Sequence, residues 1–189
     1  MLKNKNIGFV LTGSFYVIKK VIPKIKQLVK IGANVIPIMS FNLYKLNTKF
    51  GKEFINEIEN ITSKKIIYSI EETEKIGKEH LTDIIVVAPC SGNTLAKLAN
   101  GISDTPATVA VKSHLRNENN VVIALSATDA LGVNATNIGT LLNRKNFYFV
   151  PFRQDNPITK PRSLTFDVEY LIPTIEYAIS SEQIQPILL

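Results

Sequence analysis

The sequence predicts a single doubly wound α/β domain over residues 1–189, in which a parallel sheet lies between two layers of helices. Short apolar runs of strand length alternate along the chain with segments whose apolar residues recur at helical spacing. Such alternation is typical of βαβ units with right-handed crossovers. The chain of 189 residues is long enough for one domain with a substantial core and short for two, and it contains no internal repeat or linker.

The N-terminal segment predicts a strand, a helix and a second strand. Ile7–Leu11 is an apolar run typical of a strand buried on both faces. From Val17 to Val29 the apolar residues have helical spacing, Pro23 among them predicts a kink, and Gly32 ends the helix. The run 34–38 is the second strand, and its proline, which has no N–H group, predicts an edge position or a strand end.

The middle of the chain continues the alternation. Residues 48–60 predict a polar helix, 65–68 a short strand and 71–78 a charged helix. Residues 83–88, with the sequence DIIVVA, form the strongest strand signal in the chain.

The second half repeats the same pattern. A helix begins near residue 95 and ends at Gly101, and another helix is expected over 106–115. The run 121–125 predicts a strand, 138–143 a helix and 147–150 a last short strand. A stiff, proline-rich loop over 151–162 and a closing helix over 163–181 complete the prediction.

Composition excludes several functional classes. The hydrophobic content of 45% and the charged content of 20% are those of a globular chain, and no apolar stretch approaches the roughly 18 residues of a membrane span. The net charge of +6 comes from lysines scattered among acidic residues, without the concentrated basic face that nucleic-acid binding requires. The single cysteine and the absence of a signal-peptide pattern predict a cytoplasmic protein without disulfides.

A ligand site is predicted where the strands end, because ligands of doubly wound sheets bind outside the carboxyl ends of the strands. Small residues with hydroxyl or amide groups gather there. The candidate ligand-binding residues are Thr12, Gly13, Ser14, Ser40, Pro89, Cys90, Ser91, Gly92, Asn93, Thr94, Ser126 and Thr128.

The turn Thr12-Gly13-Ser14 has two interpretations. It is either an ordinary helix N-cap or a place where a phosphate meets the N–H groups at a helix start, and the similar residues after the other strands favour the phosphate. The dinucleotide motif G-x-G-x-x-G and the P-loop are both absent, so a mononucleotide such as FMN fits best. No metal site is predicted.

The segment APCSGNTLAKLANGISD, residues 88–104, resembles the A-P-x-[ST]-x-N-T-x-x-K-x-A-x-G-x-x-D segment of a flavoprotein family. That family includes phosphopantothenoylcysteine decarboxylase and the flavin prenyltransferases. The resemblance implies a flavodoxin-like (Rossmann-type) three-layer sandwich, a bound FMN that this segment helps to hold, and homo-oligomers built from trimers.

Within this family the chain resembles the B subunits of dipicolinate synthases, through IGFVLTGSF, FNLYKLNTKFG, KSHLRNENNVVIALSATDALGVNATNI and NFYFVPFRQDNPITKPRSL. The resemblance implies a partner, the A subunit of dipicolinate synthase, which carries an NAD(P)-binding domain. It also implies oxidation of a dihydrodipicolinate-type precursor to dipicolinate during sporulation. SATDALGV replaces the decarboxylase motif P-x-M-N-x-x-M-W, and neither His80 nor His114 matches the histidine those enzymes use near the flavin, which disfavours decarboxylation. A non-catalytic FMN-binding or scaffold subunit remains the alternative.

Several side chains keep two interpretations each. A dicarboxylate substrate requires cations, and Arg153, Lys160 and Arg162 are either those cations or a solvated face. Asp129 is either a general base or flavin-ring partner, or a helix N-cap. Cys90 follows a strand at a helix start, where it is either a stabilised thiolate or a small, semi-buried side chain that packs on the ring system of the cofactor. Lys112 and Arg116 are further candidates for substrate contact.

Overall fold

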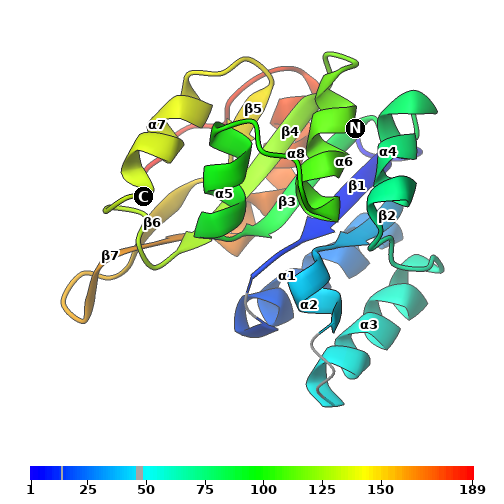
Figure 1. Cartoon of the computed structure of the whole chain (residues 1–189), viewed down its shortest axis with the longest axis horizontal. Helices are drawn as coiled ribbons and strands as arrows, with labels where there is room; N and C mark the ends of the chain where they lie inside the picture. The colour runs from blue at the N-terminus through cyan, green and yellow to red at the C-terminus, as the bar shows by residue number, and fades with distance from the viewer. Residues whose placement is uncertain (14, 46–48) are drawn as a thin grey trace.

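The structure is a computed structural model that describes residues 1–13, 15–45 and 49–189. The described residues form one seven-stranded sheet with helices on both faces (Figure 1), which confirms the predicted fold class. Five strands are parallel, and from one side to the other they are β2 (Asn34–Met39), β1 (Asn6–Leu11), β3 (Ile84–Cys90), β4 (Asn120–Ala127) and β5 (Phe147–Phe149). This is the strand order of flavodoxin-like domains.

Two helical layers cover the sheet because successive side chains of a buried strand point to opposite faces. In β1, Phe9 and Leu11 lie in one apolar core and Val10 in the other. The first core is closed by α1 (Phe15–Lys30), α3 (Lys49–Thr62) and α8 (Leu171–Ile179). The second is closed by α4 (Ile70–Lys78), α5 (Gly92–Ala99), α6 (Pro106–Leu115) and α7 (Ala135–Leu142), which lie in front of the sheet in Figure 1.

Most predicted elements are present at nearly the predicted bounds. Helix α6 has the predicted range, because Pro106 suits a first helical turn and Thr105 and Thr108 form a capping box. The predicted edge position of Pro37 is confirmed, since β2 ends the strand order. Helix α1 continues through Pro23. No helix in the described part of the chain is both long and apolar enough to cross a membrane.

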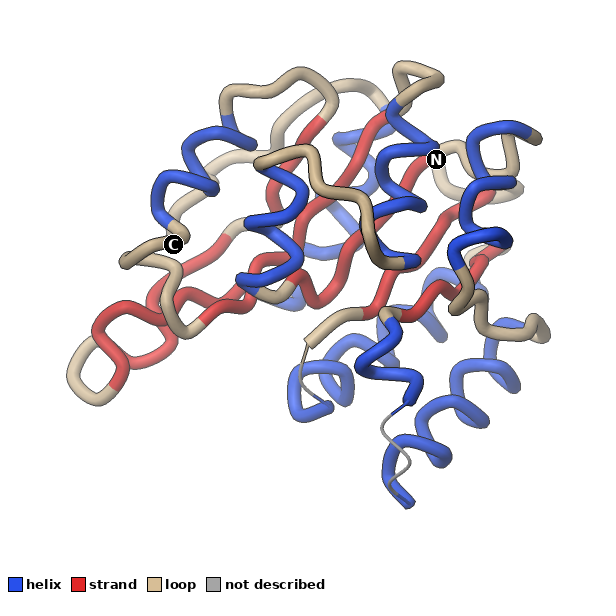
Figure 2. The backbone as a smooth tube through the Cα atoms, viewed as in Figure 1, coloured by secondary structure: helices blue, strands red, loops and turns tan. Residues whose placement is uncertain are grey.

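Three local predictions are wrong. The segment 65–68 contributes only an isolated bridge between Ile38 and Ile67, and the unpredicted short helix α2 (Phe41–Lys45) follows β2. The expected loop 151–162 is largely a hairpin of β6 (Phe152–Asn156) and β7 (Lys160–Phe166), which extends away from the sheet (Figures 1 and 2).

Because of the hairpin, the closing helix is also shorter than the predicted 163–181. β7 pairs antiparallel with the end of β4, through Ser126 with Thr165 and Ala127 with Leu164. The chain therefore turns into a helix only after Phe166, through a 3₁₀ segment at Val168–Tyr170 that leads into α8.

His114 is a buried histidine in the last turn of α6. Its Nδ1 lies 2.9 Å from Thr82 Oγ1 and its Nε2 lies 3.0 Å from the carbonyl oxygen of Asn120. A carbonyl oxygen only accepts, so Nε2 carries the proton and Nδ1 accepts from the threonine hydroxyl. Burial lowers the pKa of His114 from 6.5 to about 4.

Acid is therefore expected to destabilise the fold through His114. The unfolded chain takes up a proton at this residue below its ordinary pKa and the folded chain only near pH 4, so stability falls as pH is lowered between those values. The expected loss reaches about 3 kcal/mol of unfolding free energy. Urea denaturation at pH 7 and pH 4 measures it. His114→Gln should reduce this change of unfolding free energy with pH. His80→Asn, at an exposed histidine, is the control and should leave the change as it is in the wild type. An equal change of unfolding free energy in both variants would contradict the role of His114.

Candidate functional site

A cavity of about 760 Å³ opens at the carboxyl edge of β1, β3 and β4, between the starts of α1 and α5 and the β6–β7 hairpin. We call it the edge cavity. A neighbouring cavity of about 480 Å³ extends towards α2 and contacts Ser40 and Thr94. Both cavities are lined by Thr12, Gly13, Ser91 and Asn93. The edge cavity is also lined by Pro89, Gly92, Ser126, Thr128 and Asp129. The structure thus brings together most of the predicted site residues.

Thr12 holds the ends of two strands together. Its hydroxyl donates to the Pro89 carbonyl oxygen at 2.8 Å and accepts from the Ser91 backbone N–H at 3.0 Å. The side chain is only 1% exposed. Thr12 lines the cavity, but both hydrogen-bonding roles of its hydroxyl are already filled, so it shapes the site rather than supplying a donor to a ligand.

The start of α5 faces the site as a capped helix end. Ser91 is the N-cap: its hydroxyl oxygen accepts from the Thr94 N–H at 3.3 Å and its O–H donates to Thr94 Oγ1 at 3.0 Å. The two hydroxyls are therefore engaged with each other. The first N–H groups of a helix have no partner inside it, so the backbone of Gly92 and Asn93 remains suited to bind an anion.

Two glycines let the backbone approach closely here. Gly13 has φ +84°, and a Cβ on it would lie 3.3 Å from the Ser91 Cβ. A Cβ on Gly92 would lie 2.8 Å from both Asn134 Nδ2 and Asp129 Oδ1. A side chain at either position would thus crowd the walls of the edge cavity, and Gly13 also needs a backbone conformation that side-chain-bearing residues rarely adopt.

The donors that remain are mainly neutral. Four predicted residues have side chains without a hydrogen-bond partner among the described residues; they are Ser40, Asn93, Ser126 and Thr128. Together with the α5 start and the glycine turn, they form a polar cradle whose two adjoining volumes are in the range of small-molecule sites. This donor set fits a mononucleotide such as FMN.

Asp129 lies at one wall of the edge cavity, at the end of a hydrogen-bond chain. Its Oδ2 accepts from Asn134 Nδ2 at 2.9 Å, and Asn134 Oδ1 accepts from Asn137 Nδ2 at 2.9 Å. The chain ends at Asn100, whose amide donates to Asn137 Oδ1 at 3.3 Å. The N-cap interpretation of Asp129 is wrong, because α7 begins only at Ala135. Asn134 was not predicted, since nothing in its spacing from Asp129 marks a contact.

Two further predicted residues lie elsewhere. Cys90 is fully buried in the core beneath α5, where burial raises the pKa of its thiol, and it lines neither cavity. The Cys90 side chain therefore packs in the protein core rather than in the wall of either cavity, and its contact with a cofactor stays a prediction. Ser14 lies outside the described residues.

The three cations predicted to bind the substrate all lie in the β6–β7 hairpin, but only one of them lines the edge cavity. Lys160 lines the edge cavity and forms an ion pair with Asp155 at 2.8 Å, which raises the pKa of the lysine. Arg153 lies outside the cavity and pairs with Asp167 at 3.4 Å. Arg162 also lies outside the cavity, against the turn at Gly132.

Other charged residues at the site were not predicted individually. Lys20, from α1, lines the edge cavity. Lys97 lines the neighbouring cavity and donates to both carboxylate oxygens of Asp104 at 2.8 Å, which lowers the pKa of that aspartate. Lys97 and Asp104 both stand in the quoted segment 88–104, so the resemblance contained the signal for them.

Comparison with known proteins gives consistent matches. Residues 1–164 match the family described as Flavoprotein. The B subunit of dipicolinate synthase from Bacillus subtilis (strain 168) is 43% identical over 189 residues, covering 99% of this chain and 94% of that protein. The crystal structure of the B subunit of dipicolinate synthase from Bacillus halodurans matches with a TM-score of 0.92 and 42% identity, over 100% of this chain and 97% of that chain.

A more distant structure shares the fold alone. The FMN-dependent cysteine decarboxylase SpaF matches with a TM-score of 0.69 at 20% identity, over 95% of this chain and 98% of that chain. The family match covers most of the described chain, and the similarity to the B subunits covers nearly all of it. The chain therefore belongs to the Flavoprotein family and is a homologue of the B subunits of dipicolinate synthases.

Proposed function

We propose that this chain is the FMN-holding B subunit of a dipicolinate synthase. It works with an NAD(P)-binding A subunit to oxidise a dihydrodipicolinate-type precursor to pyridine-2,6-dicarboxylate in the cytoplasm of a sporulating cell. The observation that carries the proposal is the edge cavity, a polar cradle at the strand ends in a chain 43% identical to the B subunit of a dipicolinate synthase. FMN itself is supported by the donor set and by structural relatives such as the FMN-dependent decarboxylase SpaF.

The chain would hold the phosphate against Gly13 and the N–H groups at the start of α5, with the Asn93 amide beside them. Ser126 and Thr128 would bind the polar edges of the ring system from the end of β4. When bound, the flavin supplies an acceptor for the hydride that leaves the substrate ring.

The substrate's two carboxylates require cations within reach. Lys160 and Lys20 line the edge cavity from different elements, the hairpin and α1. Lys160 would exchange its pairing with Asp155 for a substrate carboxylate. Aromatising a dihydropyridine ring also releases a proton, and Asp129, whose carboxylate accepts a hydrogen bond from the Asn134 amide, would accept it.

The hairpin supports assembly with further copies or with the partner. Its tip carries Ile158, which is 91% exposed, and a two-stranded hairpin is marginally stable by itself. Another chain packed against the hairpin would cover this apolar tip. We therefore propose that the chain assembles into a homo-oligomer that binds the A subunit; the family resemblance favours a trimer or a multiple of it, and a solved relative, an FMN-dependent decarboxylase from Escherichia coli, is described as dodecameric.

The purified chain, incubated with FMN, is expected to retain a flavin absorbance band through gel filtration. Alone it should turn over negligible substrate, and addition of the NAD(P)-binding partner should restore dipicolinate formation, measured by product absorbance. Full turnover by this chain with flavin and oxygen only would contradict the two-subunit proposal. Restored activity without any retained flavin would favour the alternative, a scaffold subunit.

A further inference from the structure

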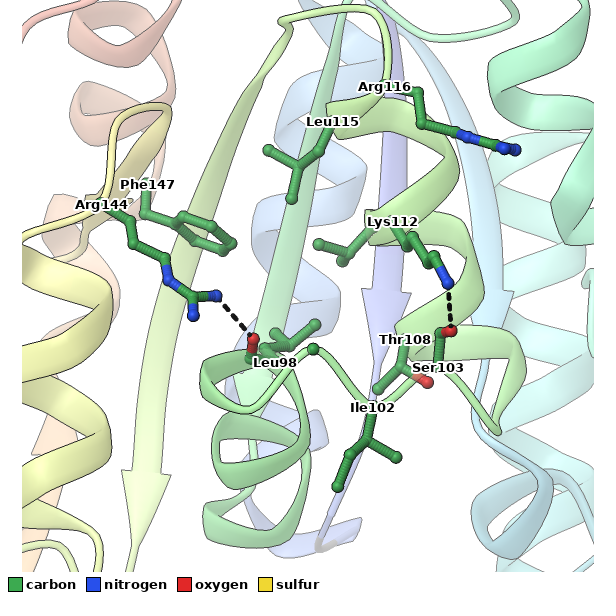
Figure 3. Close-up of a pocket in the computed structure, with 11 residues that line it drawn as sticks. Leu98, Ile102, Ser103, Thr108, Lys112, Leu115, Arg116, Arg144 and Phe147 are labelled. Atoms are coloured by element: carbon green, nitrogen blue, oxygen red, sulfur yellow. Dashed lines mark hydrogen bonds between the residues drawn. The ribbon is translucent and has the colours of Figure 1, made fainter.

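A third cavity, of about 300 Å³, lies in the layer of helices on the face of α5, α6 and α7 rather than at the strand ends. We call it the flank cavity (Figure 3). It shares no lining residue with the edge cavity or its neighbour. Its lining residues include five apolar side chains, Leu98, Ile102, Val111, Leu115 and Phe147, and three cations, Lys112, Arg116 and Arg144.

The walls of the flank cavity are apolar. Val111 is 1% exposed and Leu98 and Phe147 are 7% and 8% exposed, so they form a packed floor, whereas Ile102 at the mouth is 47% exposed. Figure 3 shows Phe147 and Leu98 on the side of the cavity opposite α6. Apolar surface left open to water in a concave site favours a ligand with an apolar body.

The charged groups of the cavity are all cationic. Arg144 donates to the carbonyl oxygen of Leu98 at 3.2 Å (Figure 3), and also to that of Ala99 at 2.8 Å, at the end of α5. These two bonds fix the guanidinium and leave further N–H donors of its five. Lys112 lies across the cavity, with Nζ 3.0 Å from Ser103 Oγ, and Arg116 follows directly after the end of α6.

These positive charges have no direct ion-pair partner; Glu74 lines an adjoining cavity together with Lys112 and Arg116, but it pairs with Lys78. No acidic side chain lines the flank cavity, and within the described residues none of the three cations forms an ion pair with Asp or Glu. Lys112 and Arg116, the further candidates for substrate contact, line this cavity and neither cavity at the strand ends. The charge and the apolar floor together define the ligand: an anion with a compact apolar body.

We propose that the flank cavity binds a small organic carboxylate built on an aromatic ring or a short branched chain. The carboxylate lies at the cationic rim that Arg144, Lys112 and Arg116 form around the cavity, and the apolar body packs against Leu98 and Phe147. The volume of the cavity is at the lower end of the range for small-molecule sites, which limits the ligand to about one ring and its substituents. The site is separate from the proposed flavin and substrate sites.

Calorimetric titration of the full chain with benzoate, and with the neutral benzamide as its matched ligand, tests the proposal. Benzoate should bind at one site per chain, and benzamide at least about tenfold more weakly, because it lacks the charge. Lys112→Gln should weaken benzoate binding about fivefold and Arg144→Gln about tenfold. The control is Lys145→Gln, which removes a neighbouring exposed cation that pairs with Glu118 outside the cavity, and it should leave the affinity unchanged.

Three results would overturn the proposal. One is the absence of benzoate binding, or equal binding of benzoate and benzamide, by the folded protein. Another is benzoate binding that persists in Lys112→Gln and is lost in Gly13→Val, which would assign it to the edge cavity. The third is a change of oligomer mass in Lys112→Gln without any acid binding, which would make the flank a protein contact. Lys112 is exposed, so this variant should fold even if Arg144→Gln loosens the end of α5.

Discussion

Gly13→Val is expected to abolish FMN binding while the protein remains folded. Gly13 has φ +84°, a conformation that costs a β-branched residue about 1–2 kcal/mol, and its Cβ would lie 3.3 Å from the Ser91 Cβ. The chain would relieve both by moving the turn, which carries the N–H groups proposed to bind the phosphate. We expect the affinity for FMN to fall at least about a hundredfold, measured by quenching of flavin fluorescence.

Gly101→Val is the matched control. Gly101 also has a positive φ, +72°, but a Cβ on it would meet no atom within 4 Å, and it lies beyond the far end of α5. Both variants carry the same kind of backbone strain, so both should lose some stability, yet only Gly13→Val should lose the flavin. Wild-type FMN affinity in Gly13→Val would show that the phosphate binds elsewhere.

The sequence predicted the elements whose signals are local. Strand β3 is a continuous apolar run buried on both faces, and α6 carries its own capping residues and an N1 proline. The C-terminal hairpin escaped prediction because three prolines favour a loop. The pairing of β7 with the end of β4, which makes it a strand, joins residues nearly forty positions apart. Contacts of that kind leave no periodic pattern in the chain.

For the candidate site, too, the sequence predicted some features and not others. Glycine, hydroxyl and amide residues after parallel strands were predicted because strand ends share one edge of the sheet, and the structure brings Gly13, Asn93 and Ser126 to one cavity. Side-chain direction could not be predicted. Cys90 points into the core, and Arg153 turns to Asp167 rather than to the cavity.

Asp129→Asn is expected to lower kcat of the assembled enzyme by about a hundredfold to a thousandfold, with FMN affinity unchanged. The replacement has nearly the same shape, and its Oδ1 still accepts a hydrogen bond from the Asn134 amide, which now donates to an oxygen without charge. What it loses is the ability to take the proton released when the substrate ring becomes aromatic. Steady-state kinetics with the A subunit and the dihydrodipicolinate-type substrate measure this effect.

Asp155→Asn supplies the comparison, because Asp155 is a second carboxylate at the edge cavity, placed on the hairpin and paired with Lys160. It should leave kcat within about threefold, since its carboxylate only balances the lysine charge.

Asn134→Ala should reduce kcat about tenfold by releasing Asp129 from its fixed orientation, with KM nearly constant. If Asp129→Asn and Asp155→Asn lower kcat equally, Asp129 contributes only charge to the cavity. The proton would then leave through another group, and the carboxylate held by the Asn134–Asn137 chain would serve to stabilise the turn before α7.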